Sequence, residues 1–224
     1  RDYKDIKALH ISSPGNPTGT LYEPENLKRL VQYCEEKGIY FISDEIYHGL
    51  VYEGKERTAL EFSQKAIVVN GFSKFFCMPG FRLGWLILPE ERMVRQAEVI
   101  IQNLFISAPT LSQYAALEAF DYEYLTTVRE TYRRRRKLLY EELREVLDIE
   151  VMPEGAFYLW VNVERYASDS YEFAKKLLEE ARVAVTPGID FGKNKTEKYI
   201  RLSYTKHEDT LREGALRIKN YLMR

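Results

Sequence analysis

The sequence has few cysteines and lacks long apolar runs. Its 224 residues include only Cys34 and Cys77, which lie far apart and in no spacing typical of a metal site. Two isolated cysteines exclude a disulfide framework and suit a reducing compartment, and we expect no bound metal. No apolar run is long enough to span a bilayer and no signal peptide is recognisable, so we expect a cytoplasmic protein without a membrane partner.

The sequence also lacks a charge excess of either sign. Its 33 basic and 34 acidic residues give a net charge of −1. The chain therefore lacks the overall basic character of proteins that bind nucleic acid, and we expect no nucleic-acid partner. One basic cluster, YRRRRK at residues 132–137, is followed by Leu139, Leu143 and Leu147 at helical spacing. We interpret this cluster as the solvated face of an amphipathic helix.

The first half of the sequence alternates short apolar segments with an amphipathic one. Strands are predicted at ALHIS (8–12), IYFIS (39–43), AIVVN (66–70) and GWLILP (84–89), with a helix at 24–38. Buried strands that alternate with a helix indicate an α/β layer with a largely parallel sheet.

The second half is richer in helical patterns. Helices are predicted at 110–120, through the charged run to Leu147, at 169–183 and at 209–222, with strands at 157–163 and 198–204. We place a domain boundary near residue 125, which gives domains of residues 1–125 and 126–224.

Polar side chains follow three of the predicted strands. They are Asn16 after the first, Asp44 and Tyr47 after the second, and Ser73 and Lys74 after the third, with Arg82 eight residues beyond the lysine. Each residue alone has an ordinary explanation, such as a turn, a cap, a solvated amine or an ion pair. In open α/β sheets, however, ligands bind beyond the carboxyl ends of the strands, where these residues should gather.

A lysine, an acid and an arginine together suit one cofactor. A desolvated lysine amine can form a Schiff base with an aldehyde, and an acid can keep a pyridine nitrogen protonated. An arginine offers a planar fork of donors to a phosphate. These three requirements describe pyridoxal phosphate.

The motifs together resemble the class I/II aminotransferases, pyridoxal-phosphate enzymes with the fold of aspartate aminotransferase. In family order they are SPGNPTGT, SDEIYHGL, GFSKFFCMPGFRLGW, PEGAFYLWV and TPGIDFGKNKTEKYIRLSY, which run from near Ser12 to Tyr204. The resemblance implies an α/β chain that forms the C-terminal part of a mostly parallel-sheet large domain, which binds the cofactor, and a small C-terminal α/β domain. It also implies a homodimeric enzyme that transfers an amino group between an α-amino acid and a 2-oxo acid.

The resemblance assigns the cofactor residues by matching position. Lys74 would be the Schiff-base lysine and would move the proton between the substrate's α-carbon and the cofactor's C4′. Asp44 would pair with the pyridine nitrogen, and Tyr47 and Asn16 would hydrogen-bond the phenolate oxygen of the ring.

Phosphate and substrate residues are assigned in the same way. Ser73 and Arg82 would contact the phosphate, and Arg201 would bind the substrate's α-carboxylate with help from Asn16. Gly71 stands where many members have a serine that binds phosphate, so we expect one donor to be missing.

Family members also carry a substantial segment before NPTG, which supplies a phosphate-cradling turn, a ring stacked on the pyridine and much of the dimer contact. This sequence begins with Arg1 and has nothing before Asn16 that could play those parts. The resemblance therefore implies an incomplete portion of such an enzyme, and we expect little activity from it alone.

Three alternatives stay open at this point. One is a carbon–sulfur β-lyase on the same fold, since cofactor electronics and carboxylate binding serve both reactions. Another is a non-catalytic, aminotransferase-like ligand-sensing domain, and the third is an inert fragment. The identity of the amino acid and of the 2-oxo acid does not follow from the sequence.

Overall fold

The structure is a computed structural model that describes residues 5–223, and these fall into two compact units. The first unit comprises the residues up to Gly15 together with Leu21–Arg129, and the second comprises Asn16–Thr20 and the residues from Glu130 onward. The division thus lies within the long helix α4 (Tyr122–Leu143). The domain boundary predicted near residue 125 stays a prediction, because compactness alone does not define an independently folding domain.

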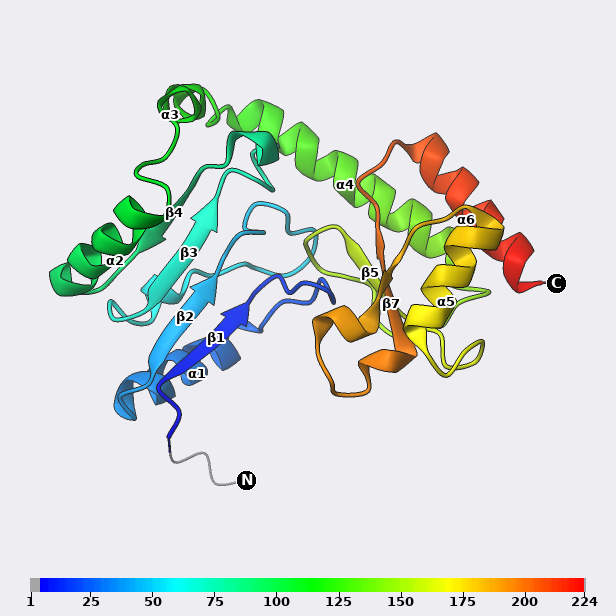
Figure 1. Cartoon of the computed structure of the whole chain (residues 1–224), viewed down its shortest axis with the longest axis horizontal. Coiled ribbons are helices and arrows are strands. Elements are labelled where there is room, and N and C mark those ends of the chain that lie inside the picture. The colour runs from blue at the N-terminus through cyan, green and yellow to red at the C-terminus, as the bar shows by residue number, and fades with distance from the viewer. Residues whose placement is uncertain (1–4, 224) are drawn as a thin grey trace. The chain divides into compact units, whose positions relative to one another are not determined.

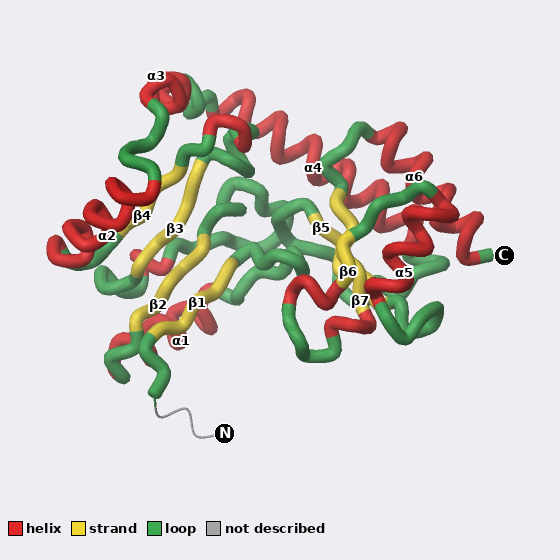
Figure 2. The backbone as a smooth tube through the Cα atoms, viewed as in Figure 1, coloured by secondary structure: helices red, strands yellow, loops and turns green. Residues whose placement is uncertain are grey.

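The first unit is built on a four-stranded sheet in the order β1-β2-β3-β4 (Figures 1 and 2). Its strands are β1 (Ala8–Ser12), β2 (Tyr40–Asp44), β3 (Ile67–Gly71) and β4 (Gly84–Ile87). The first three are mutually parallel and β4 pairs antiparallel with β3. The predicted largely parallel sheet is therefore confirmed, and the carboxyl ends of β1, β2 and β3 lie along one edge of it.

One face of this sheet is covered by α1 (Pro24–Glu36), as Figure 1 shows. Pro24 stands in the first helical turn, where its missing N–H costs no hydrogen bond. The helix buries Leu27, Val31 and Cys34 against Phe41 of β2. The spacing of these apolar residues in the sequence predicted this buried stripe.

Two further helices of the first unit bury little. They are α2 (Glu91–Leu104) and α3 (Thr110–Leu117). Leu104, Ile106 and Leu111 are 73%, 82% and 84% exposed, and no residue of α2 is buried among the residues that the structure describes. This apolar surface has no partner within residues 5–223.

The second unit holds an antiparallel sheet in the order β5-β7-β6. Its strands are β5 (Tyr158–Asn162), β6 (Thr186–Pro187) and β7 (Tyr199–Ser203), and its helices are the second part of α4, α5 (Ser170–Lys176) and α6 (Glu208–Leu222). A π-helical turn at Leu177–Ala181 continues α5. Ile200 and Leu202 of β7 are buried, as are Leu139 and Leu143 of α4.

The basic cluster on α4 differs from its prediction at one residue. Arg136 is only 4% exposed, and its Nη1 donates to the carbonyl oxygen of Pro153 at 2.7 Å. The interpretation of the whole cluster as a solvated face is therefore wrong for this arginine.

The short segment Asn16–Thr20 belongs to the second unit, although strand β1 just before it belongs to the first. The backbone N–H of Gly155 donates to the carbonyl oxygen of Gly19 at 2.8 Å. A Cβ at Gly19 would lie 2.4 Å from Cβ of Pro153, so only glycine permits this close approach. The peptide bonds that precede Pro14 and Pro17 are cis.

Two further features bear on the sequence predictions. Within residues 5–223, no helix is long and apolar enough to cross a membrane. Both cysteines are free thiols, Cys34 in the core of the first unit and Cys77 at its surface.

Candidate active site

The strand edge of the first unit brings together an acid, a phenol and an amine. Asp44 is the last residue of β2, Tyr47 lies in the turn that follows, and Lys74 lies in the loop after β3. The Lys74 Nζ is 5.7 Å from the centroid of the Tyr47 ring. Strand order explains this proximity, because β2 and β3 are parallel neighbours whose carboxyl ends meet at one edge.

Asp44 is half-buried and has one carboxylate oxygen in use. Its Oδ1 accepts a hydrogen bond from the backbone N–H of Ile46 at 3.2 Å, which closes a tight turn. Its Oδ2 has no partner among residues 5–223, so it can accept a hydrogen bond from a ligand. No helix begins at Asp44, so the alternative of a helix cap does not apply.

The loop after β3 carries the remaining first-unit residues. The Ser73 hydroxyl is half-buried and makes no hydrogen bond within the described chain. Arg82 is exposed, adopts a left-handed backbone with φ 53°, and donates from Nη1 to the carbonyl oxygen of Pro79 at 2.7 Å. Gly71 ends β3, and a Cβ there would lie 3.0 Å from the carbonyl oxygen of Leu83. Strand packing thus accounts for a small residue at position 71.

In the second unit, Arg201 and Asn16 are hydrogen-bonded across 185 residues of sequence. The Nη1 of Arg201 donates to Asn16 Oδ1 at 2.7 Å, and its Nη2 donates to Thr186 Oγ1 at 3.2 Å. The Nε is buried and has no hydrogen-bond partner in the described part of the chain. A buried donor without an acceptor is costly, so an acceptor that reached this atom would be stabilising.

Two aromatic rings enclose the Arg201 guanidinium. Its Cζ is 4.2 Å from the centroid of Tyr158 and 4.7 Å from that of Phe191. These cation–π contacts help to hold the guanidinium in place. Phe157 is buried and stacks on Tyr132, so it belongs to the core of the second unit.

Thr186 and Phe191 are residues of this group that the sequence analysis did not single out. Both lie in the TPGIDFG motif, so the family resemblance contained a signal that could have found them. Thr186 belongs to a two-residue strand whose register opposite Arg201 appears only in the sheet. The pairing of segments that are distant in sequence therefore determines which residues contact the Arg201 side chain.

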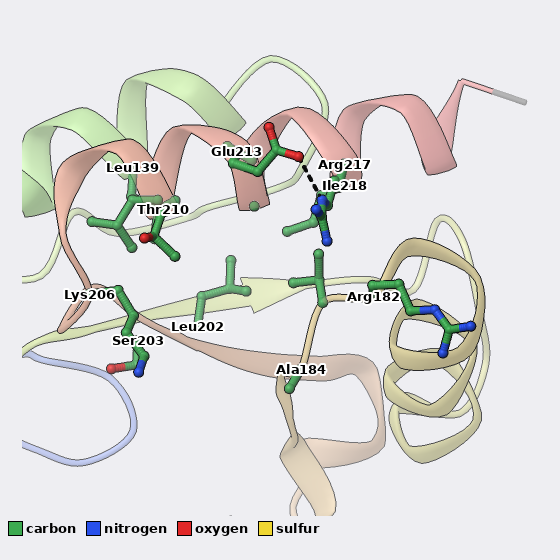
Figure 3. Close-up of a pocket in the computed structure, with 14 residues that line it drawn as sticks. Leu139, Arg182, Ala184, Leu202, Ser203, Lys206, Thr210, Glu213, Arg217 and Ile218 are labelled. Atoms are coloured by element: carbon green, nitrogen blue, oxygen red, sulfur yellow. Dashed lines mark hydrogen bonds and ion pairs between the residues drawn. The ribbon is translucent and has the colours of Figure 1, made fainter.

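A separate cavity of about 420 Å³ lies in the second unit, where α6 covers the sheet (Figure 3). Its lining includes Leu139, Leu202 and Ile218, with the Arg217–Glu213 ion pair at its rim. None of the residues assigned from the sequence lines it. Within β7, Arg201 and Leu202 point to opposite faces of the sheet, so this cavity does not belong to the Arg201 group.

Known proteins match nearly the whole chain. Residues 1–218 match the aminotransferase class I and II family, and the chain belongs to that family. A (5-formylfuran-3-yl)methyl phosphate transaminase of Methanocaldococcus jannaschii is 43% identical over 96% of the chain and 58% of its own length. A valine–pyruvate aminotransferase of Mycobacterium tuberculosis is 38% identical over 97% of the chain and 57% of its own length.

Solved structures agree with this assignment. The crystal structure of an aminotransferase from Mycobacterium tuberculosis superposes with a TM-score of 0.93 at 36% identity, covering 99% of this chain and 58% of that one. The predicted fold is therefore confirmed. The chain spans a little under three fifths of the length of the relatives that it matches.

Proposed function

We propose that this chain is part of a pyridoxal-phosphate-dependent aminotransferase that transfers an amino group between an α-amino acid and a 2-oxo acid. The observation that carries the proposal is the group of Asp44, Tyr47 and Lys74 at one sheet edge. The relatives are named aminotransferases of several substrates, which supports the reaction and leaves the amino acid open.

The residues present fit the cofactor. Asp44 Oδ2 is an acceptor without a partner among residues 5–223, as a protonated pyridine nitrogen requires. Ser73 and Arg82 offer a hydroxyl and a guanidinium to a phosphate. Lys74 supplies the amine through which such a cofactor is held. When bound, pyridoxal phosphate supplies an aldehyde that exchanges amino groups and a ring that accepts electrons.

The side chains of the first unit take distinct roles in this proposal. Lys74 holds the cofactor and moves a proton between the substrate's α-carbon and C4′ of the cofactor. Asp44 keeps the pyridine nitrogen protonated, and the Tyr47 hydroxyl donates to the phenolate oxygen of the ring. Ser73 and Arg82 bind the phosphate.

Asn16 and Arg201 bind the substrate's α-carboxylate. The unpartnered Nε of Arg201 gains its acceptor when a carboxylate oxygen arrives. Asn16 already accepts from Arg201 through Oδ1, so its amide N–H groups remain to donate to the substrate or to the phenolate oxygen of the ring. Tyr158 and Phe191 keep the guanidinium in place for this contact.

We also propose that the complete enzyme is a cytoplasmic homodimer. Two free thiols support a reducing compartment, and the family resemblance implies the dimer. Sedimentation of the complete gene product tests the assembly.

Covalent labelling tests the role of Lys74. Sodium borohydride, added with pyridoxal phosphate to the complete gene product, makes the bond between the lysine amine and the cofactor's aldehyde carbon permanent. Peptide mapping is expected to find the label on Lys74 and to find none in the Lys74→Ala variant. A label on another lysine with Lys74 unmodified would contradict the proposal.

A substrate assay separates transfer from the β-lyase alternative. An aminotransferase consumes more than one equivalent of amino acid per site only when a 2-oxo acid is present, and it releases no ammonia. Pyruvate and ammonia formed from cystathionine alone would favour the lyase instead.

A further inference from the structure

We propose that a contact between Gly49 and Phe75 sets the position of Lys74, which makes both of them positioning residues. The inference rests on the proposed function for its catalytic meaning, whereas the contact itself is a property of the first unit. Two segments are involved. The Tyr47 turn is residues 44–50, and the lysine loop is residues 72–78.

Gly49 lies directly beneath the ring of Phe75. A Cβ added at Gly49 would be 2.1 Å from Cδ1 and 2.4 Å from Cε1 of that ring. Carbon atoms in contact prefer about 3.5–4.0 Å, so any side chain at position 49 must displace the ring or the turn. Gly49 also has φ +88°, a left-handed backbone that favours glycine.

The Tyr47 turn cannot easily retreat, because hydrogen bonds hold it from the other side. Glu45 is only 4% exposed. Its Oε1 accepts hydrogen bonds from Thr58 Oγ1 and from the N–H of Ala59, each at 3.0 Å. The N–H of Gly49 itself donates to Glu56 Oε2 at 2.8 Å. A clash at Gly49 is therefore relieved chiefly by movement of Phe75.

The clash also reaches Cγ of Phe75 at 2.4 Å, so turning the ring about its own axis does not relieve it. The displacement then passes to the backbone of the lysine loop, in which Lys74 is the preceding residue. Tyr47, whose ring is 5.7 Å from Lys74 Nζ, stays fixed with its turn. Gly49 thus sets the spacing between the amine and the phenol. A displacement of about 1 Å at a catalytic group can cost about 100-fold in rate.

The chain offers a matched control at Gly38. Its φ is +67°, and a Cβ there would meet nothing within 4 Å. Gly38→Ala and Gly49→Ala both place a side chain on a left-handed backbone, so both should lower thermal stability. Only Gly49→Ala meets Phe75. A merely structural role would lower the stability of the variants but leave the absorbance profile of the bound cofactor unchanged in both.

The experiment compares these variants in the complete gene product. For Gly49→Ala we expect an affinity for pyridoxal phosphate at least tenfold lower, a shifted pH dependence of the bound cofactor's absorbance, and a kcat about 100-fold lower. For Gly38→Ala we expect wild-type values of all three. Identical affinities and absorbance profiles in the two variants would overturn the inference.

A second substitution tests the steric cause. Phe75→Ala in the Gly49→Ala background makes room for the new methyl group and is expected to restore part of the lost affinity. No recovery would overturn the inference. If Gly49→Ala does not fold, Phe75→Leu alone takes its place, with a shifted absorbance profile expected and an unchanged one counting against the contact.

Crystal structures of the two glycine variants keep this inference separate from the proposed function. In Gly49→Ala the distance from Lys74 Nζ to the Tyr47 ring should differ from that in Gly38→Ala, with or without cofactor. An unchanged distance would overturn the positioning role. A wild-type protein that binds no pyridoxal phosphate would instead refute the proposed function.

Discussion

Asp44 has one carboxylate oxygen committed to the backbone and one that is not. Oδ1 holds the N–H of Ile46, and Oδ2 has no partner within residues 5–223. The side chain therefore combines two roles, closure of the turn and provision of a negative charge. Substitutions can separate these roles, because asparagine keeps the first and loses the second.

We predict that Asp44→Ala lowers turnover by about 100-fold or more while cofactor affinity falls much less. Without the acid, nothing would hold a proton on the pyridine nitrogen, whereas the proposed contacts of Lys74 and Arg82 would still retain the cofactor. Steady-state kinetics and a cofactor titration of the complete gene product measure the two effects.

Asp44→Asn is the matched variant, because its amide oxygen can still accept from Ile46. Turnover as low as that of Asp44→Ala would show that the charge, not the turn, is what matters. Near-wild-type turnover in both variants would remove Asp44 from its proposed role.

At the scale of the residue, the partners of two arginines could not be predicted from the sequence. Arg201 could be assigned from its motif, but its partner Thr186 lies on a neighbouring strand whose register the sequence does not state. Burial of Arg136 is tolerated because the carbonyl oxygen of Pro153 accepts a hydrogen bond from its guanidinium. That acceptor lies 17 residues away in a loop, so no local pattern reports it.

At the scale of the element, Glu142 joins α4 to α6. Its carboxylate contacts Lys219 Nζ at 2.5 Å and Arg212 Nη1 at 3.0 Å. The hydrogen bond from Lys219 is the main reason that the pKa of Glu142 lies below its usual range, and the nearby charges of Lys219 and Arg212 add to the effect.

The lowered pKa of Glu142 determines how the stability of the folded chain changes with pH. Since Glu142 is more acidic in the folded chain, its contribution to stability is present above the unfolded pKa of about 4.3. That contribution is lost as the pH falls through the lower, folded pKa. We predict that Glu142→Gln lowers the free energy of unfolding at neutral pH by up to about 1 kcal/mol.

Urea unfolding of Glu142→Gln and wild type across this pH range measures the difference, which should vanish below the folded pKa. Glu141→Gln is the control, because among residues 5–223 Glu141 pairs only with Lys137, the residue one turn earlier in the same helix, at 3.8 Å. A loss that does not depend on pH would contradict the electrostatic origin.

Most elements could be predicted, and the exceptions have physical reasons. No element is predicted from the sequence at α2, because its start carries no side-chain cap and its apolar stripe is not buried in the chain described. Strand β6 contains Pro187, a residue that usually indicates a turn or an edge. Its pairing with β7 depends on long-range contacts that a local pattern cannot contain.

At the scale of the whole molecule, α2 and α3 present a large apolar surface. Leu104, Leu111 and Leu117 are all more than two-thirds exposed. Exposed apolar side chains of this size favour association in water.

We predict that the 224-residue chain alone self-associates and has far less transaminase activity than the complete gene product, even with excess pyridoxal phosphate. Sedimentation over a range of concentrations, and an assay with an amino acid and 2-oxoglutarate, measure the two properties. Leu104→Lys with Leu111→Lys should reduce association, whereas Lys substitutions at the exposed polar residues Gln64 and Asn220 should not. A chain that stays monomeric and turns over at the rate of the complete product would contradict both expectations.

The placement of Asn16–Thr20 has a consequence for recombination between related genes. A single crossover at the junction in α4 would unite Arg201 and Thr186 from one parent with Asn16 and Gly19 from the other. Such a chimera inherits the two halves of the proposed carboxylate site from different ancestors. The second unit is exchanged intact only when Asn16–Thr20 is transferred together with the residues from Glu130 onward. The part of the gene that must be inherited together therefore consists of two separate stretches.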